Sequence, residues 1–278
     1  MKAIKAALIV QNCIAGDYKN NLASTLDFIY QASKKNAKII VFPEMNLTGY
    51  VSGSDILSIC RPVTQEMIKT FSNIAQQLDI TILTGLAEKA SKKDIYASHL
   101  IFNPSGEYDR YKKIHTSPFE KKYFTPGNKI KVFTSHGLNI AIQLCYDAHF
   151  PELSTAMALK KTDIIFIPHA SPRGTPLDKY NSWIRHLRAR AYDNGLYVAA
   201  CNQTGDNSKG LVFPGISLLI GPDGNVIYKS IDQQEGIHII NLEKFALDQV
   251  RSHKMRYFLP NRRNDLFELK MNNLGILQ

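Results

Sequence analysis

Short apolar runs alternate along the chain with longer segments whose apolar residues recur at helical spacing. In residues 64–78, for example, Met67, Phe71, Ile74 and Leu78 fall on one side of a helix. The same spacing predicts helices over residues 21–33, 64–78, 152–160 and 181–193. The apolar runs predict strands over residues 3–10, 39–42, 80–86, 97–103, 107–114, 138–145, 163–168, 196–201 and 216–220.

Strands that alternate with helices indicate an α/β fold in which helices cover the sheets. The chain has 278 residues, of which 44% are apolar, and this is enough for one substantial core. We find no proline- or glycine-rich linker and no internal repeat, so residues 1–278 are interpreted as a single domain. The last stretch, 257–278, is polar with isolated apolar residues, and we expect it to pack on the domain or on a partner subunit.

Targeting and redox features favour a protein of the reducing cytoplasm. The first residues lack a signal-peptide cleavage site, and no apolar stretch approaches the roughly 20 residues needed to cross a bilayer. The four cysteines form neither C-x-x-C pairs nor a dense disulfide framework, and no metal-binding motif occurs. We therefore expect a cytoplasmic protein without a membrane partner and without a metal site.

Lys and Arg outnumber Asp and Glu by 34 to 24, which gives a net charge of +10. Such an excess is typical of a nucleic-acid surface or of a site for an anionic substrate. The densest basic stretch, residues 110–131, lies beside no RNA-recognition motif, helix-turn-helix signature or zinc-finger spacing. A nucleic-acid-binding protein is therefore the less favoured alternative to an enzyme, and we expect no nucleic-acid partner.

Three residues capable of chemistry follow or end predicted buried strands. Glu44 comes after the strand at 39–42, Lys113 ends the second strand of a hairpin, and Cys145 ends the strand at 138–145. In α/β folds, reacting groups gather just beyond the carboxyl ends of strands. A thiol can act there as a nucleophile if a base removes its proton and a cation holds the oxyanion that forms. Each residue alone also has an ordinary explanation, such as a buried thiol or a surface charge.

The sequence around these residues resembles a known family. Residues 42–44 (Phe-Pro-Glu), 111–115 (Tyr-Lys-Lys-Ile-His) and 144–152 (Leu-Cys-Tyr-Asp-Ala-His-Phe-Pro-Glu) resemble, in the same order, the three signature segments of the nitrilase, or carbon-nitrogen hydrolase, superfamily. Later segments of the chain resemble that family as well: residues 188–195, 202–205 and 221–224. The resemblance implies a four-layer α-β-β-α sandwich that pairs into a homodimer or a larger homo-oligomer.

Carried over position by position, the resemblance implies that Cys145 is the nucleophile, Glu44 the general base and Lys113 the stabiliser of the oxyanion. Glu120 resembles a second glutamate of the family's pocket, which would orient Lys113 or the substrate nitrogen. The implied reaction cleaves a small amide through a thioester on Cys145 and releases ammonia or an amine and a carboxylic acid, with no cofactor. The backbone N–H of Tyr146 is a further candidate donor to the oxyanion.

The residues after the cysteine favour the amidase branch, because Cys145-Tyr146-Asp147 resembles amidases more than true nitrilases. Amidases of dicarboxylate monoamides often have an arginine where this chain has His149. The substrate therefore stays open, and hydrolysis of N-carbamoyl compounds or of nitriles remains an alternative. Arg173, in a loop after a predicted strand, is a candidate clamp for a substrate carboxylate.

Three histidines near the predicted site offer other possibilities, namely His115, His149 and His169. If His149 were the base, the site would be a Cys-His pair on an unrelated fold. The simpler interpretation is that these histidines shape the pocket or pair with carboxylates. We therefore name Tyr146, His149, His169 and Arg173 as candidate substrate-binding residues.

The helices at 152–160 and 181–193 are candidate elements of a dimer interface. With Leu187, Ala191 and Tyr192 facing outward, the second helix would expose apolar area that a partner subunit could cover. We therefore expect at least a homodimer.

Overall fold

The structure is a computed structural model that describes residues 3–263, 265 and 266, and these residues form two six-stranded sheets. The first sheet has the order β14-β1-β2-β3-β4-β5, with bounds Gly236–Leu242, Ile4–Val10, Ile39–Val41, Thr81–Lys89, Ile95–Phe102 and Tyr108–Lys112. The second has the order β13-β12-β9-β8-β7-β6, with bounds Val226–Ser230, Ser217–Ile220, Tyr197–Asn202, Ile164–His169, Leu138–Ile142 and Phe133–Ser135. A separate short pair consists of β10 (Gly205–Asp206) and β11 (Val212–Phe213).

Helices connect and cover these strands. In chain order they are α1 (Tyr18–Lys34), α2 (Ile56–Ile59), α3 (Gln65–Leu78), α4 (Pro151–Leu159), α5 (Pro176–Asn194) and α6 (Lys244–Arg251). Short 3₁₀ turns occur at Gly53–Asp55, Cys145–His149 and Leu259–Asn261. No described helix is long and apolar enough to span a membrane.

The outer face of the first sheet is covered by α1 and α3. The Thr64 side chain accepts a hydrogen bond from the Met67 backbone N–H and so begins α3, and Asp79 ends it in the left-handed region. Phe71 of α3 stacks on Phe102 of β4 with ring centroids 5.1 Å apart. Both side chains are fully buried, so the apolar side that the sequence predicts for this helix is the side that contacts the sheet.

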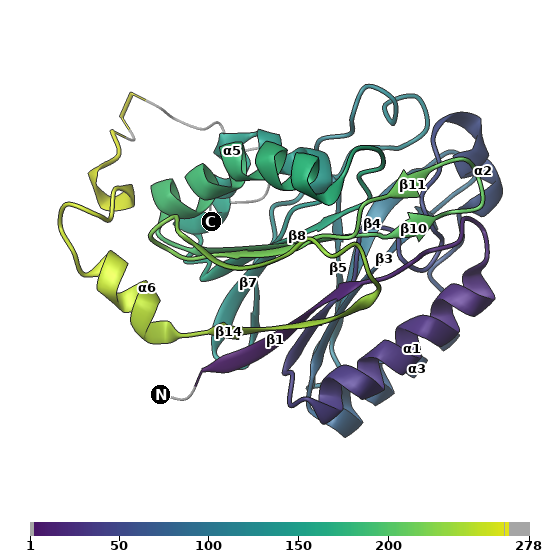
Figure 1. The fold of residues 1–278 in the computed structure, drawn as a ribbon, viewed down its shortest axis with the longest axis horizontal. Coiled ribbons are helices and arrows are strands. Elements are labelled where there is room, and N and C mark those ends of the chain that lie inside the picture. Colours follow the sequence, from purple (N-terminus) through teal and green to yellow (C-terminus); the bar gives the residue numbers. More distant parts are fainter. Residues whose placement is uncertain (1–2, 264, 267–278) are drawn as a thin grey trace.

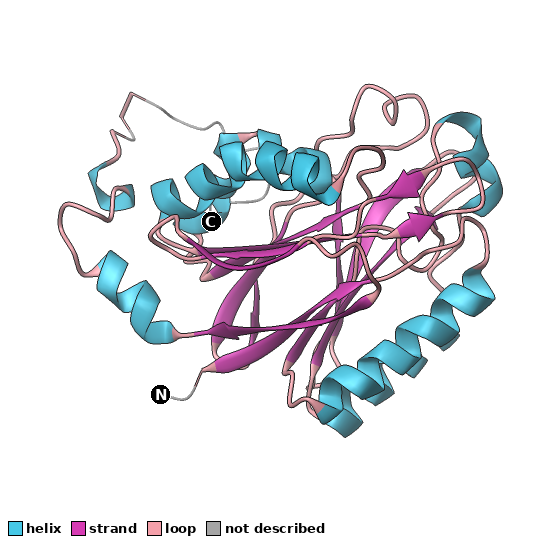
Figure 2. Cartoon of the chain, viewed as in Figure 1, coloured by secondary structure: helices cyan, strands magenta, loops and turns pink. Residues whose placement is uncertain are grey.

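The two sheets pack face to face, and the helices lie outside them. α1 and α3 lie on one side of the paired sheets, and α5 lies on the other (Figures 1 and 2). There α5 contacts β9 and β12 and packs beside α4. The order of layers is helix, sheet, sheet, helix, which confirms the predicted α-β-β-α sandwich.

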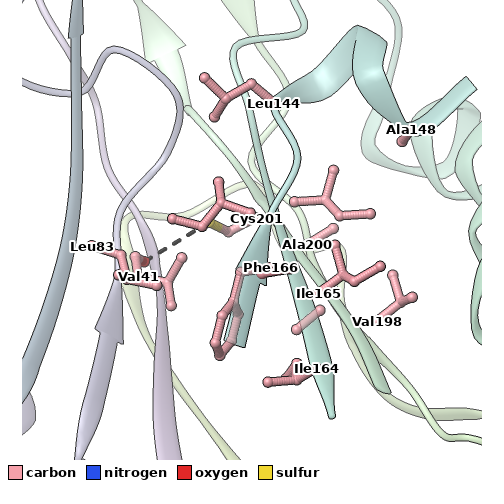
Figure 3. Packing of buried hydrophobic residues seen from close by; sticks show 14 of the residues in the cluster. Val41, Leu83, Leu144, Ala148, Ile164, Ile165, Phe166, Val198, Ala200 and Cys201 are labelled. Carbon is pink, nitrogen blue, oxygen red and sulfur yellow. Dashed lines mark hydrogen bonds between the residues drawn. The ribbon is translucent and has the colours of Figure 1, made fainter. Parts of the chain in front are cut away.

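Apolar side chains fill the space between the sheets. Phe166 of β8 and Cys201 of β9 point toward Val41 and Leu83 of the first sheet (Figure 3). All four side chains are almost fully buried, and the Cys201 thiol donates to the Val41 carbonyl at 3.8 Å. Burial of this apolar area, at about 25 cal/mol per Å², is the principal term that holds the two sheets together.

Helix α5 begins five residues earlier than the sequence predicts. Thr175 and Asp178 form a capping box, in which each side chain accepts from the other's backbone N–H, and Pro176 occupies the first turn. The prediction that Leu187 and Ala191 face outward is wrong, because both are fully buried against the sheet. Tyr192 alone of the three is exposed.

Other elements differ at their edges. β7 ends at Ile142 rather than at Cys145, because the chain turns into the 3₁₀ segment that follows. β6, β14 and α6 were not among the predicted elements, since their patterns are short or irregular. Of the predicted C-terminal stretch, Leu259 is buried and belongs to the main core cluster, and the larger part lies outside the described residues.

Candidate active site

A lysine between two carboxylates is buried where the two sheets meet. Glu44 comes directly after Pro43, beyond the end of β2. Lys113 follows β5, and Glu120 lies in the turn beyond Lys113. The Lys113 ammonium donates to Glu44 Oε1 and to Glu120 Oε1, each at 2.9 Å. All three residues are at most 2% exposed, so these charged groups are removed from water and satisfy one another.

Burial sets the protonation of this cluster. Burial raises the pKa of Glu44 to about 7. The charge of Lys113 lowers this pKa but only partly offsets burial, and the charge of Glu120 raises it further. Burial would lower the pKa of Lys113, but the charges of Glu44 and Glu120 outweigh it and hold that pKa well above its usual value. Lys113 is thus a permanent cation, whereas Glu44 can exchange a proton near neutral pH.

Backbone contacts fix the Glu44 carboxylate. Its Oε2 accepts from the Ala170 backbone N–H at 3.1 Å, and its own carbonyl accepts from Gln203 Nε2 at 2.8 Å. Asn46, two residues further, accepts from the Gly85 backbone N–H at 2.7 Å. A Cβ on Gly85 would approach the Met45 backbone nitrogen to 2.7 Å. Glycine at this position therefore allows the backbone of β3 to lie close to the turn that contains Glu44 and Met45.

Cys145 opens the 3₁₀ turn after β7 with a positive φ of 42°, a backbone conformation that is rare outside glycine. The buried Asp147 carboxylate holds this turn by accepting from the Leu144 backbone N–H at 3.0 Å and from the Tyr111 hydroxyl at 2.8 Å. The same carboxylate also accepts from the backbone N–H of His115 at 2.7 Å and pairs with Nδ1 of the His115 imidazole at 3.0 Å. One carboxylate therefore ties the cysteine turn to the segment that carries Lys113.

The charges of this cluster change the pKa of the Cys145 thiol. Burial, and then the charge of Glu44, raise the pKa of Cys145 to about 12, while Lys113 lowers it. The thiol is therefore protonated at rest, and a nearby base is needed to form the thiolate. Glu44, with its pKa near 7, is the carboxylate that contributes most to the shift at Cys145.

A cavity of about 380 Å³ opens beside Cys145. Its lining includes three of the predicted substrate-binding residues, His149, His169 and Arg173. Arg173 is exposed, with a φ of 68°, and its backbone N–H donates to the Val212 carbonyl at 2.9 Å. The fourth predicted residue, Tyr146, is not among the lining residues, because its ring packs against His149 and Phe150.

Aromatic stacking forms the cavity wall. The His169 ring stacks on Trp183 with centroids 3.8 Å apart, and the His149 ring stacks on His186 at 4.4 Å. Of the three histidines that the sequence singles out, His115 pairs with the Asp147 carboxylate, and the other two line the cavity.

Several residues of this site were missed from the sequence. Lys179, Ser182, Trp183 and His186 all line the cavity from one side of α5. Their spacing of three and four residues is the helical signal that could have revealed them, but the predicted helix began only at 181. Tyr50 was missed too: burial and then the charge of Glu120 raise the pKa of its hydroxyl.

The described residues contain no group of three or more histidine, cysteine or acidic side chains arranged to hold a metal ion. The buried charges that act on Cys145 include one ammonium and two carboxylates that satisfy each other.

Comparison with known proteins identifies the family. A family model described as carbon-nitrogen hydrolase matches residues 5–252. The chain belongs to the carbon-nitrogen hydrolase family. It is therefore an enzyme that hydrolyses carbon-nitrogen bonds, as the resemblance implied.

Similar members of the carbon-nitrogen hydrolase family cover nearly the whole chain. An (R)-stereoselective amidase of Pseudomonas sp is 29% identical over 250 residues, which are 89% of this chain and 87% of that one. A nitrilase of Pyrococcus abyssi is 26% identical over 274 residues, which are 95% and 99% of the two chains. The crystal structure of a carbon-nitrogen hydrolase from Helicobacter pylori G27 is similar with a TM-score of 0.85 and 26% identity, covering 97% of this chain and 99% of that one.

Proposed function

We propose that the enzyme cleaves a small amide with Cys145 as nucleophile, Glu44 as general base and Lys113 as stabiliser of the oxyanion. The observation that carries this proposal is the buried Glu44–Lys113–Glu120 cluster, with hydrogen bonds of 2.9 Å, beside a protonated thiol at the wall of a cavity. Glu120 orients the Lys113 ammonium. The stacking of His149 on His186 favours Glu44 over His149 as the base.

The groups support a two-step reaction. Glu44 accepts the Cys145 proton as the sulfur attacks the carbonyl carbon, and Lys113 with the Tyr146 backbone N–H stabilises the oxyanion. The carbon-nitrogen bond then breaks, Glu44 returns the proton to the leaving nitrogen, and ammonia or an amine departs from a thioester. Glu44 next takes a proton from water as the water oxygen attacks the thioester. The carbon-sulfur bond then breaks, Glu44 returns the proton to the sulfur, and the carboxylic acid departs. No metal or organic cofactor takes part.

Release of ammonia from a panel of small amides, nitriles and N-carbamoyl compounds tests this function. We expect amides to be the best substrates, because the similar enzyme of Pseudomonas sp is an amidase and the segment after Cys145 resembles that branch. Relatives named nitrilase and N-carbamoylputrescine amidase keep the two alternatives open. Iodoacetamide should label Cys145 mole for mole. A panel that released no ammonia would contradict the proposal.

The pH dependence of turnover should report Glu44. Because burial raises the pKa of Glu44 to about 7 and only the ionised carboxylate accepts the thiol proton, kcat/KM for a neutral amide should rise with pH through about 7. Since the charge of Glu120 raises that pKa, Glu120→Gln should move the rise to lower pH. Rates measured from pH 5 to 9 check this, and a rise at the same pH in both proteins would contradict the assignment.

We propose that the substrate bears a carboxylate and that Arg173 assists in binding it. The guanidinium is exposed at the cavity that opens beside Cys145, which suits a partly hydrated ion pair. Arg173→Ala should raise KM for carboxylate-bearing amides by about fivefold, because water and salt weaken an exposed ion pair. It should change KM for neutral amides far less. Equal changes for both kinds of amide would contradict this role.

The remaining assignments concern the setting of the enzyme. We propose that residues 1–278 form one domain and that the chain is a cytoplasmic homodimer or larger homo-oligomer with no nucleic-acid or membrane partner. All four cysteines are unpaired, which supports a reducing compartment. Exposed Leu159 and Tyr192 on α4 and α5 support these helices as an interface.

A further inference from the structure

A second ammonium lies in the cavity beside Cys145, apart from the buried cluster. Lys179, in the first turns of α5, lines the same cavity as the cysteine. Its Nζ donates to Ser171 Oγ at 2.7 Å and to the Pro172 carbonyl at 2.9 Å. An ammonium has three N–H groups, so one donor remains after these two contacts. The two anchors fix the position of the charge, and the third donor is available to a ligand.

No acid neutralises Lys179 in the described structure. The one acid in the described lining is Asp178, whose exposed carboxylate accepts from the backbone N–H and the hydroxyl of Thr175 and so serves as a helix cap. The only other charged lining residue is the Arg173 guanidinium. Two cations and one engaged carboxylate leave the cavity positive, which favours an anionic ligand.

The histidines of the wall add no charge at neutral pH. Burial lowers the pKa of His169 far below its usual value and that of His186 to about 4, and it also lowers the pKa of His149. His169 is only 2% exposed, and neither of its ring nitrogens has a hydrogen-bond partner among the described residues. A buried polar ring without a partner is costly, so the cavity is built for a polar ligand that supplies the missing contact.

We propose that Lys179 determines specificity by binding the carboxylate of an amide substrate whose acyl chain ends in that group, with the amide carbon at Cys145 and the chain against His169 and Trp183. This inference rests on the proposed amidase function and deepens it. It places the principal charge contact at the half-buried, doubly anchored Lys179, and leaves to the exposed Arg173 a weaker part in drawing the anion in. A charge-assisted bond is stronger where water is partly excluded.

A purely structural role for Lys179 would be to pin residues 171 and 172. Two variants separate this role from charge recognition. Lys179→Gln removes the charge but keeps a donor for Ser171 or Pro172, and Lys179→Arg keeps the charge. Lys229→Met serves as the matched control, because its ammonium packs over the Tyr180 ring on the same helix, 4.5 Å from the centroid, and does not line the cavity.

The test compares succinamate with butyramide, and glutaramate with valeramide, as pairs of charged and neutral substrates. The readout is the ratio of kcat/KM for the charged substrate to that for the neutral one. Lys179 also lowers the pKa of Cys145, but any effect through the thiol acts on both substrates and cancels in the ratio. We expect a ratio above one in the native enzyme and a loss on the order of 30-fold in Lys179→Gln, the size of one lost charge-assisted hydrogen bond.

Lys179→Arg should keep most of the preference, and Lys229→Met should keep all of it. An unchanged ratio in Lys179→Gln, or a native enzyme that does not prefer the charged substrates, would overturn the role of Lys179 while hydrolysis of butyramide still upheld the amidase. Failure to hydrolyse any amide would instead overturn the proposed function itself. The two failures are therefore distinguishable in one set of assays.

Discussion

Replacing Cys145 with alanine is expected to lower amide hydrolysis by at least about 10⁴-fold, because removal of a nucleophile leaves only binding and oxyanion stabilisation. The thiol is partly exposed to the cavity and donates no structural hydrogen bond among the described residues, so folding should be retained. Ammonia release measures the loss, and a thermal melt measures folding. Intact-mass analysis should show an acyl adduct during turnover of the native enzyme and none with Cys145→Ala.

Cys60→Ala is the matched control for this experiment. Cys60 is the other thiol that is not fully buried, and it lies outside the cavity. Its replacement should preserve turnover and the single iodoacetamide label at Cys145. Continued ammonia release by Cys145→Ala, or loss of that label in Cys60→Ala, would show that the nucleophile has been assigned to the wrong residue.

Replacing Lys113 with methionine is expected to reduce turnover by about 10³-fold, since the oxyanion loses its cation. It should also lower the free energy of unfolding by about 3–5 kcal/mol at pH 8, because Glu44 and Glu120 are left as buried carboxylates without a counterion. Loss of the cation raises the pKa of Glu44 further above its unfolded value. Stability of the variant should therefore fall as pH rises through about 5 to 8, and urea unfolding at both ends of that range measures this.

Lys112→Met provides the comparison for Lys113→Met. Lys112 is the adjacent residue, and its ammonium packs over the Tyr96 ring at the surface, 3.3 Å from the centroid. Its replacement should change neither turnover nor the pH dependence of stability to a similar degree. A Lys113→Met variant as stable at pH 8 as at pH 5 would contradict the buried ion cluster.

The residues that we propose as reactive, Glu44, Lys113 and Cys145, could be singled out from the sequence because each is embedded in a short, recognisable segment after a strand. Lys179 could not be singled out, because its place in the cavity depends on where α5 begins, and the capping box at Thr175 was not interpreted as a helix start. Leu187 was assigned to the wrong side of the same helix for a related reason: an apolar stripe does not reveal whether its own sheet or another subunit covers it. The contacts of Asp147 with Tyr111 and His115 join segments more than 30 residues apart, which local patterns do not encode.

The proposed base and the proposed nucleophile are carried by different sheets: Glu44 follows β2 of the first and Cys145 follows β7 of the second. Their relative position is therefore set by contacts between the sheets, namely the apolar layer in which Cys201 meets Val41 and the hydrogen bonds to Glu44 from residues 170 and 203, rather than by any short stretch of chain. The proposed reaction therefore depends on how the two sheets pack against each other. Heat or denaturant that loosens the packing between the sheets should move the Cys145 thiol away from the Glu44 carboxylate. Turnover should therefore fall as soon as this packing is disturbed.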